Sequence, residues 1–256
     1  MNATGFYDGL SAHYDRFVDW PSRLAFEMPF LQSTLAQFQA HSVMDSACGT
    51  GQHVLALAKL GIEASGSDIS EQMIARAQEN ADRMGAQVSF YVAGFGQLAQ
   101  RVAIKYDAIL CLGNSLPHLL SENALRDALE DWHASLAANG ILILQMRNLE
   151  RVLKERQRFM PPQIMADEQG EWVFERFYDW LLNSLIRFNM LRWRRPPGQG
   201  WQLEEAATDL RAWIHQELET HLENMGLPIV QTYGDLAGTK YVSDSSNDVV
   251  IVARKS

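Results

Sequence analysis

The segment that decides the fold is "VMDSACGTG", residues 43–51. An apolar pair runs into an acid, Asp45, and two closely spaced glycines, Gly49 and Gly51, precede a segment whose apolar residues have helical spacing up to Leu60. Glycine allows a tight bend and lets a ligand approach the backbone where a Cβ would block it. The segment therefore predicts a strand, a ligand-binding turn and a helix.

This turn lacks the two common phosphate-binding patterns. Val54 stands where GxGxxG needs its third glycine, and no Lys follows Gly51 as in a nucleotide-binding P-loop. Asp68, 17 residues after Gly51, ends the next expected strand and can accept hydrogen bonds from both hydroxyls of a ribose. With Asp45 available for an ammonium group, the turn suits S-adenosylmethionine (SAM). The alternative is a purely structural turn with a surface acid.

Strands and helices alternate along the first part of the chain, which predicts a doubly wound α/β fold with a mostly parallel, Rossmann-like sheet. Right-handed crossovers place the ligand crevice of such a sheet at the carboxyl ends of its strands. A helix over 22–39, with Ser22 as its cap, precedes the sheet. The seven expected strands cover 43–44, 62–68, 88–92, 106–112, 141–146, 229–233 and 249–253, with helices at 52–60, 70–84, 122–136 and 215–225.

After residue 147 this rhythm changes. A helix is expected over 149–159, and a pair of strands, 185–193 and 203–213, is expected around the turn-rich segment 196–200. We interpret this region as an insertion after the fifth strand that covers the crevice. The chain is then one domain, 1–256, with a helical cap at 1–40 and a substrate-side insertion at 148–213.

The composition narrows the class of protein. The formal charge is −9 and no long Lys/Arg run offsets it, which argues against nucleic acid or an anionic membrane as the main partner. Cys48 and Cys111 stand far apart, and the seven histidines show no HxH or HxxxH spacing, so no metal site is expected. With no signal peptide and no apolar run near the ~18 residues of a membrane span, we expect a cytoplasmic enzyme.

Two motifs carry a family resemblance that extends over nearly the whole chain. "VMDSACGTG" and "SGSDISEQMIARA", residues 65–77, resemble the glycine-rich and ribose-binding motifs of class I SAM-dependent methyltransferases. The resemblance implies SAM as cofactor and S-adenosylhomocysteine as product. It also implies that Ile69 and Met73 flank the adenine or ribose.

A narrower resemblance points to the glycine/sarcosine N-methyltransferases. "YDAILCLGNSLPHL", residues 106–119, and "QMRN", residues 145–148, are similar to motifs of that group. So is the spacing of Asp19 and Arg23, and there the resemblance implies that Arg23 meets the SAM carboxylate. It also implies that Arg147 binds an amino-acid carboxylate, as a planar guanidinium can through two parallel hydrogen bonds.

Asn114 is the other acceptor contact that the resemblance implies. Its side-chain oxygen can accept an amine hydrogen and aim the nitrogen lone pair. Asn114 could instead only shape the turn, and Arg147 could pair with Glu130 or Glu150 on the surface. The segment "VAGFGQL", residues 92–98, departs from the family because it has no acid for the adenine amine, although Phe95 can still pack on the ring.

The expected site has a cofactor side and an acceptor side. Tyr14 belongs to both, because it could close over SAM, although it could equally be a core residue. His118 is either an acceptor contact or a packing residue at a helix start. The acceptor side comprises Tyr14, Gly113, Asn114, His118 and Arg147, of which Asn114 and Arg147 are the catalytic candidates. The cofactor side comprises Tyr14, Arg23, Asp45, Ala47, Cys48, Gly49, Gly51, Asp68, Ile69, Met73, Gly94, Phe95 and Leu112.

These observations predict SAM-dependent methyl transfer to the amine of a small molecule, with glycine, sarcosine or a related amino acid as first choice. One alternative is a class I methyltransferase acting on the oxygen or ring nitrogen of another small metabolite. A second is a non-catalytic SAM-binding module. A monomer or a small homo-oligomer is expected.

Overall fold

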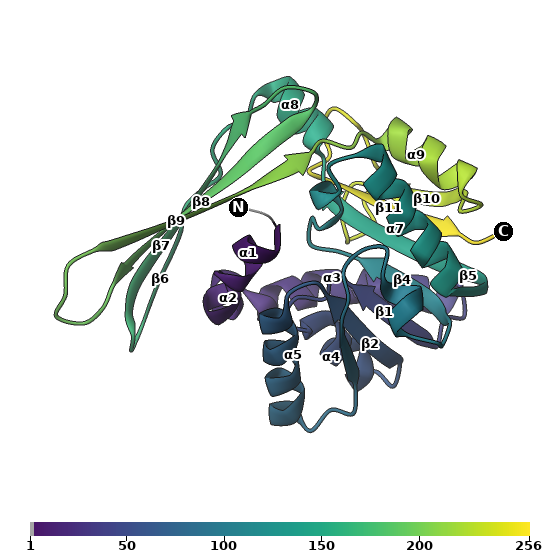
Figure 1. Ribbon diagram of the computed structural model, residues 1–256, viewed down its shortest axis with the longest axis horizontal. Coiled ribbons are helices and arrows are strands. Elements are labelled where there is room, and N and C mark those ends of the chain that lie inside the picture. Colours follow the sequence, from purple (N-terminus) through teal and green to yellow (C-terminus); the bar gives the residue numbers. More distant parts are fainter. Residues whose placement is uncertain (1–2) are drawn as a thin grey trace.

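The computed structural model describes residues 3–256, apart from the side chains at positions 3, 12 and 13. Its centre is a seven-stranded sheet in the order β10-β11-β5-β4-β1-β2-β3 (Figure 1). The neighbours from β3 to β5 pair in parallel, whereas β11 runs antiparallel to both β5 and β10. Its strands are β1 (Ser42–Ser46), β2 (Glu63–Asp68), β3 (Ser89–Val92), β4 (Tyr106–Cys111), β5 (Leu136–Arg147), β10 (Ile229–Tyr233) and β11 (Asp248–Arg254).

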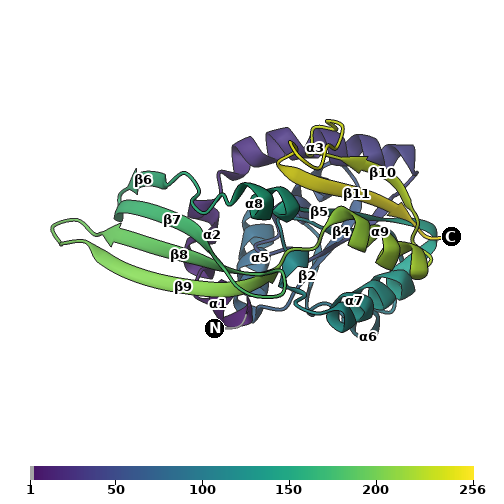
Figure 2. The same cartoon turned by 90° about the horizontal axis from the view of Figure 1, so that it is seen from above.

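Helices cover both faces of this sheet (Figure 2). On one face, α3 and α4 pack on the strands with the side chains of Val43 and Leu110. On the other face, α6, α7 and α9 pack on Met44 and Ile109. Because neighbouring residues of one strand supply both cores, β4 is a nearly continuous apolar run. The helices here are α3 (Trp20–Gln37), α4 (Gln52–Lys59), α5 (Glu71–Met84), α6 (Leu98–Arg101), α7 (Glu122–Ser135) and α9 (His215–Asn224).

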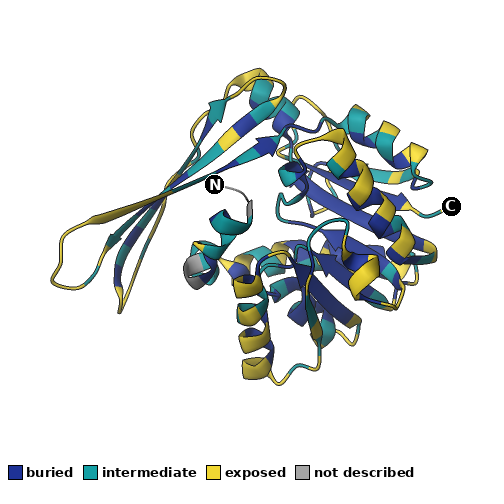
Figure 3. Cartoon of the chain, viewed as in Figure 1, coloured by how far each residue is buried: buried dark blue, intermediate teal, exposed yellow. Residues whose placement is uncertain are grey.

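A second, four-stranded antiparallel sheet, which we call sheet B, is inserted between β5 and α9. It extends from the main body as a long arm with exposed outer loops and buried residues along its strands (Figure 3). The short helices α1 (Ala3–Asp8) and α2 (Ser11–Phe17) fill the space between this arm and the main sheet (Figure 1). Sheet B consists of β6 (Gln163–Asp167), β7 (Gly170–Trp180), β8 (Leu185–Arg195) and β9 (Gln202–Arg211).

The seven-stranded, mostly parallel sheet confirms the fold class, while several boundaries differ from expectation. The helix expected from 149 ends at Glu155 (α8, Leu149–Glu155), because the following chain pairs with sheet B through Phe159 and Phe177. The cap of α3 is Asp19, whose side chain accepts the N–H of Ser22, rather than Ser22 itself. None of the helices in the described part of the chain is both long and apolar enough to span a membrane.

Candidate active site

A cavity of about 250 Å³ opens at the carboxyl ends of the parallel strands. The structure brings together the whole expected cofactor side there except Gly51: the cavity is lined by Tyr14, Arg23, Asp45, Ala47, Cys48, Gly49, Asp68, Ile69, Met73, Gly94, Phe95 and Leu112. From the expected acceptor side, it is lined by Tyr14, Gly113 and His118, whereas Asn114 and Arg147 lie outside its lining.

The two glycines of the turn are needed for different reasons, one for the cavity and one for packing. Gly49 lies in the cavity wall, where its N–H donates to Asp68 Oδ2 at 2.9 Å. Gly51 caps α4 with φ 79°, and a Cβ there would come within 2.7 Å of the Phe90 ring. Packing between the turn and β3 therefore demands Gly51, while Gly49 is the glycine that leaves backbone open toward a ligand.

Asp45 is the acid of the turn, and its side chain is almost fully buried. Its Oδ1 has no hydrogen-bond partner among the described residues, and its Oδ2 lies 4.0 Å from His53 Nδ1. Burial raises the pKa of this carboxyl to about 6, although the neighbouring His53 opposes the shift. A buried acceptor without a partner is costly, so the wall of the cavity fits a cationic group such as an ammonium.

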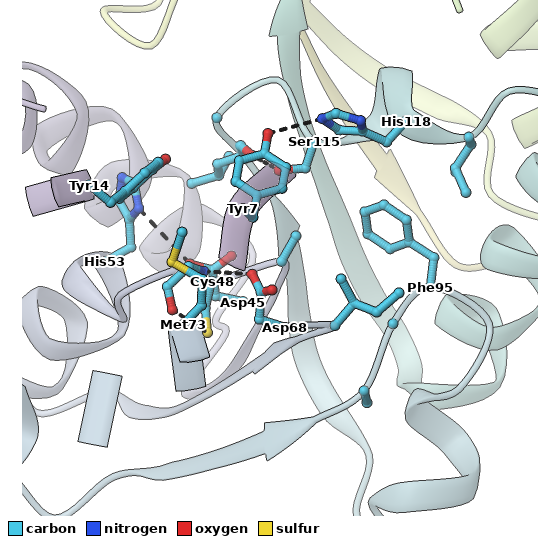
Figure 4. A pocket seen from close by; sticks show the side chains of 18 of the residues that line it. Tyr7, Tyr14, Asp45, Cys48, His53, Asp68, Met73, Phe95, Ser115 and His118 are labelled. Carbon is cyan, nitrogen blue, oxygen red and sulfur yellow. Dashed lines mark hydrogen bonds and ion pairs between the residues drawn. The ribbon is translucent and has the colours of Figure 1, made fainter. Parts of the chain in front are cut away.

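A chain of ionisable side chains runs from Asp45 through His53, whose contact with Asp45 is drawn in Figure 4, to Glu27 and Arg23. His53 Nε2 lies 2.6 Å from Glu27 Oε2, and Arg23 Nε donates to Glu27 Oε1 at 2.9 Å. Burial alone would raise the pKa of Glu27, but its hydrogen bond to His53 and the charge of Arg23 lower it overall. Arg23 also lies over the Trp20 ring at 5.0 Å, so a cation and an acid are fixed on the same wall. The cation Arg23 and the acid Asp45 together match a ligand that carries both the carboxylate and the ammonium of an amino acid.

Asp68 occupies the end of β2, as expected. Its Oδ1 accepts the N–H of Ser70 at 2.9 Å, and its Oδ2 accepts the N–H of Gly49. Each carboxylate oxygen retains a further lone pair for a ligand hydroxyl. Farther along the wall, Gly94 and Ile69 are so close that a Cβ on Gly94 would lie 3.0 Å from Ile69 Cδ1. Together with Phe95, which packs edge-on to Trp132, they form an apolar slot that suits a flat ring.

The far end of the cavity pairs His118, an expected acceptor-side residue, with Tyr7, which sequence reasoning missed. Tyr7 Oη and His118 Nε2 are hydrogen-bonded at 2.9 Å (Figure 4). Burial lowers the pKa of His118 to about 4, so this ring is neutral near pH 7. Its Nδ1 is buried without a partner among the described residues. Tyr7 is on α1, far from every motif in the chain, and no spacing in the sequence marks it.

Asn114 joins the ends of β4 and β5. Its backbone is left-handed, with φ 67°, and its Oδ1 accepts the N–H of Arg147 at 2.9 Å. Gln145 strengthens the same junction by accepting the N–H of Gly113 at 2.7 Å. The Arg147 side chain has a buried Nε without a hydrogen-bond partner among the described residues, and it stands in register with Asp248 on β11.

Comparisons with known proteins agree with this geometry. Residues 43–140 match the family model described as "Methyltransferase domain". The glycine/sarcosine N-methyltransferase of Aphanothece halophytica is 33% identical over 98% of this chain and 89% of its own length. That of Parasynechococcus marenigrum is 36% identical, over 58% of this chain and 53% of its own.

Solved structures share the fold. An S-adenosylmethionine-dependent methyltransferase from Clostridium acetobutylicum superposes with a TM-score of 0.79, at 16% identity, over 97% of this chain and 98% of its own. The SAM-bound amino pentose methyltransferase CalS10 from Micromonospora echinaspora superposes with a TM-score of 0.71, at 18% identity, over 96% and 95%. Three features fit SAM, which one of these solved structures holds: the Asp45 Oδ1 atom that no described residue pairs with, the open backbone at Gly49 and the apolar slot. The chain therefore belongs to the class I SAM-dependent methyltransferases, as a relative of their glycine/sarcosine N-methyltransferases.

Proposed function

We propose that this enzyme transfers the methyl group of SAM to the amine of a small amino acid, with glycine or sarcosine as acceptor. The observation that carries the proposal is the buried Nε of Arg147 at the carboxyl end of β5, which has no hydrogen-bond partner in the described part of the chain. The Arg147 N–H is bonded to Asn114, which follows the cavity-lining residue Gly113, and a guanidinium with an unused donor at this position suits an acceptor carboxylate. The names of the relatives support the same acceptor class.

On the cofactor side, Asp45 receives the ammonium and Arg23 the carboxylate of SAM, while Asp68 takes the ribose hydroxyls. Bound SAM supplies an electrophilic methyl group. The remaining cofactor contacts come from the turn, where Gly49 exposes backbone, and from the slot beside Phe95. The role of each residue follows from the group that it presents to the cavity.

On the acceptor side, the chain positions a neutral amine. Asn114 already uses one lone pair of Oδ1 for Arg147, and its second lone pair remains for an amine hydrogen. His118, neutral because of its lowered pKa, offers a further polar contact near Tyr7. Orientation of two reactants can contribute about 7–11 kcal/mol, so no strong base is required when the amine arrives uncharged.

A panel of acceptors tests this function. Purified enzyme and SAM are incubated with glycine, sarcosine, glycinamide, an amino sugar and a phenol, and S-adenosylhomocysteine is measured. We expect turnover with glycine or sarcosine and much weaker turnover with glycinamide, which lacks the carboxylate. Turnover confined to the sugar or the phenol would overturn the amino-acid assignment. SAM binding without turnover of any acceptor would favour a non-catalytic module.

A further inference from the structure

Sheet B carries an arginine on the face that it turns toward the main body. Residues of β7 alternate between its two faces, and Trp172, Phe174 and Tyr178 are buried on the inner one. Arg176 lies between Phe174 and Tyr178 in this alternation, so it belongs to the same inner face. An arginine in a row of buried aromatic residues requires a polar partner.

The surroundings of Arg176 leave its charge largely unused. Its guanidinium lies over the Phe17 ring of α2 at 5.0 Å, and its Nε is buried without a hydrogen-bond partner among the described residues. One long contact, 3.5 Å, joins Nη2 to the carbonyl of Pro161. Arg192 on the same face differs, because it pairs with Glu204 at 2.9 Å.

Arg176 of sheet B interacts electrostatically with Arg147 at the end of β5. Burial lowers the pKa of Arg176, and the positive charge of Arg147 lowers it further. Tyr178, two residues along β7, interacts electrostatically with both arginines and with Asp248. It packs against Leu149, which begins α8 just after Arg147. The insertion and the end of β5 therefore meet at these two guanidiniums.

The two guanidiniums keep unused donors at this junction. The Nε atoms of Arg147 and Arg176 are both buried without a hydrogen-bond partner among the described residues. Asp248, the cross-strand neighbour of Arg147, is already used, because its Oδ2 accepts a hydrogen bond from Gln145 at 2.9 Å. Buried guanidinium donors without partners are stabilised by an anion, above all by a carboxylate that can accept from more than one guanidinium.

We propose that Arg176 is the second guanidinium of the acceptor-carboxylate site, so that sheet B contributes directly to substrate specificity. The inference rests on the proposed function. Arg147 reaches the carboxylate from the main sheet, and Arg176 reaches it from the insertion. A substrate with a free carboxylate then ties sheet B to the main body, whereas a neutral amine of the same size leaves the two guanidiniums uncompensated.

Steady-state kinetics with glycine and sarcosine test this inference. Arg176→Gln should raise the KM for the amino acid roughly 10- to 100-fold, since a hydrogen bond to a charged group contributes about 1.5–3 kcal/mol. Arg176→Lys should recover part of the loss. The SAM affinity of both variants, measured by calorimetry, should equal that of the wild type, which also verifies their folding.

The matched control is Arg187→Gln, on the outer face of the same sheet, where Arg187 pairs with Asp209 at 2.9 Å. It should leave the KM unchanged. An unaltered KM in Arg176→Gln, beside a raised KM in Arg147→Gln, would overturn the role of Arg176 and leave the proposed function intact. Failure of the wild type to methylate glycine or sarcosine would overturn both.

Discussion

Asp45 and His53 face each other across the base of the cofactor cavity, with 4.0 Å between Asp45 Oδ2 and His53 Nδ1. Asp68, Arg23 and Glu27 are the other charged groups that act on Asp45. Its pKa of about 6 means that the carboxyl gains a proton just below neutral pH. The charge that Asp45 presents to a cation in the cavity therefore changes with pH in this range.

SAM affinity should consequently fall as the pH drops. If the ammonium of SAM needs ionised Asp45, affinity at pH 5 should be about tenfold lower than at pH 7, because one pH unit below a pKa leaves about a tenth of the acid ionised. Calorimetry between pH 5 and pH 8 measures this. Asp45→Asn should weaken binding at pH 7 and flatten the profile. An unchanged slope in this variant would assign the titration to another group.

The stability of the free enzyme should change in the opposite sense. A carboxyl with a raised pKa holds its proton more tightly when folded, so its contribution to stability is lost as the pH rises from its unfolded value toward about 6. Asp45→Asn should therefore raise the melting temperature of the free enzyme at pH 7, and less so at pH 5. A lower melting temperature at pH 7 would show that ionised Asp45 stabilises the fold.

Gly51→Ala should destabilise the protein more than Gly61→Ala. Both glycines have φ near 80°, but a Cβ at Gly61 meets nothing within 4 Å, whereas one at Gly51 would collide with Phe90. The backbone strain common to both costs about 1–2 kcal/mol, and the collision adds roughly 1–3 kcal/mol. Denaturant unfolding measures the difference, and equal losses would refute the steric explanation.

Asp68→Ala should reduce SAM affinity by roughly 10- to 100-fold, because it removes the ribose acceptor and releases the N–H groups of Gly49 and Ser70. Asp107→Ala is the matched control. Asp107 likewise accepts two backbone N–H groups, those of His41 and Ser42, outside the cavity lining. If Asp107→Ala weakened SAM binding as much, general destabilisation would explain the loss.

Arg147→Lys should raise the KM for the amino acid at least tenfold while leaving SAM affinity unchanged, since an ammonium cannot form the paired hydrogen bonds of a guanidinium. Arg126→Lys provides the comparison. Arg126 is more than half exposed and lies 3.9 Å from Glu130, the acid considered as a surface partner for Arg147. Identical kinetics in the two variants would remove Arg147 from the acceptor site.

The sequence predicts the main sheet well because periodicity and turn chemistry reflect local physics. Ser70 caps α5 through the N–H of Met73, and Gly85 ends that helix in the left-handed conformation, both as expected from residue type. The fifth strand was expected to begin at residue 141. In the structure β5 begins at Leu136 and contains Asn139 with a left-handed φ of 62°, because pairing with β4 extends the strand on both sides of this residue.

Local sequence patterns could not predict the contacts between segments that lie far apart in the chain. Tyr7 reaches His118 across more than a hundred residues, and Arg176 reaches the environment of Arg147 only because sheet B folds back over α2. The strands β6 and β7 were missed for a related reason. Trp172 and Phe174 of β7 and Met165 of β6 pack in one cluster with the N-terminal helices, so the spacing of apolar residues within these strands does not by itself reveal a sheet.

The central claim is methyl transfer to an amino-acid nitrogen, and following the methyl group itself is its most direct test. The enzyme is incubated with glycine and SAM carrying an isotopically labelled methyl group, and products are identified by mass spectrometry. We predict labelled N-methylglycine, with S-adenosylhomocysteine formed in equal amount. If glycine and sarcosine both remain unlabelled while a carboxylate-free acceptor gains the methyl group, the account of the acceptor site is wrong.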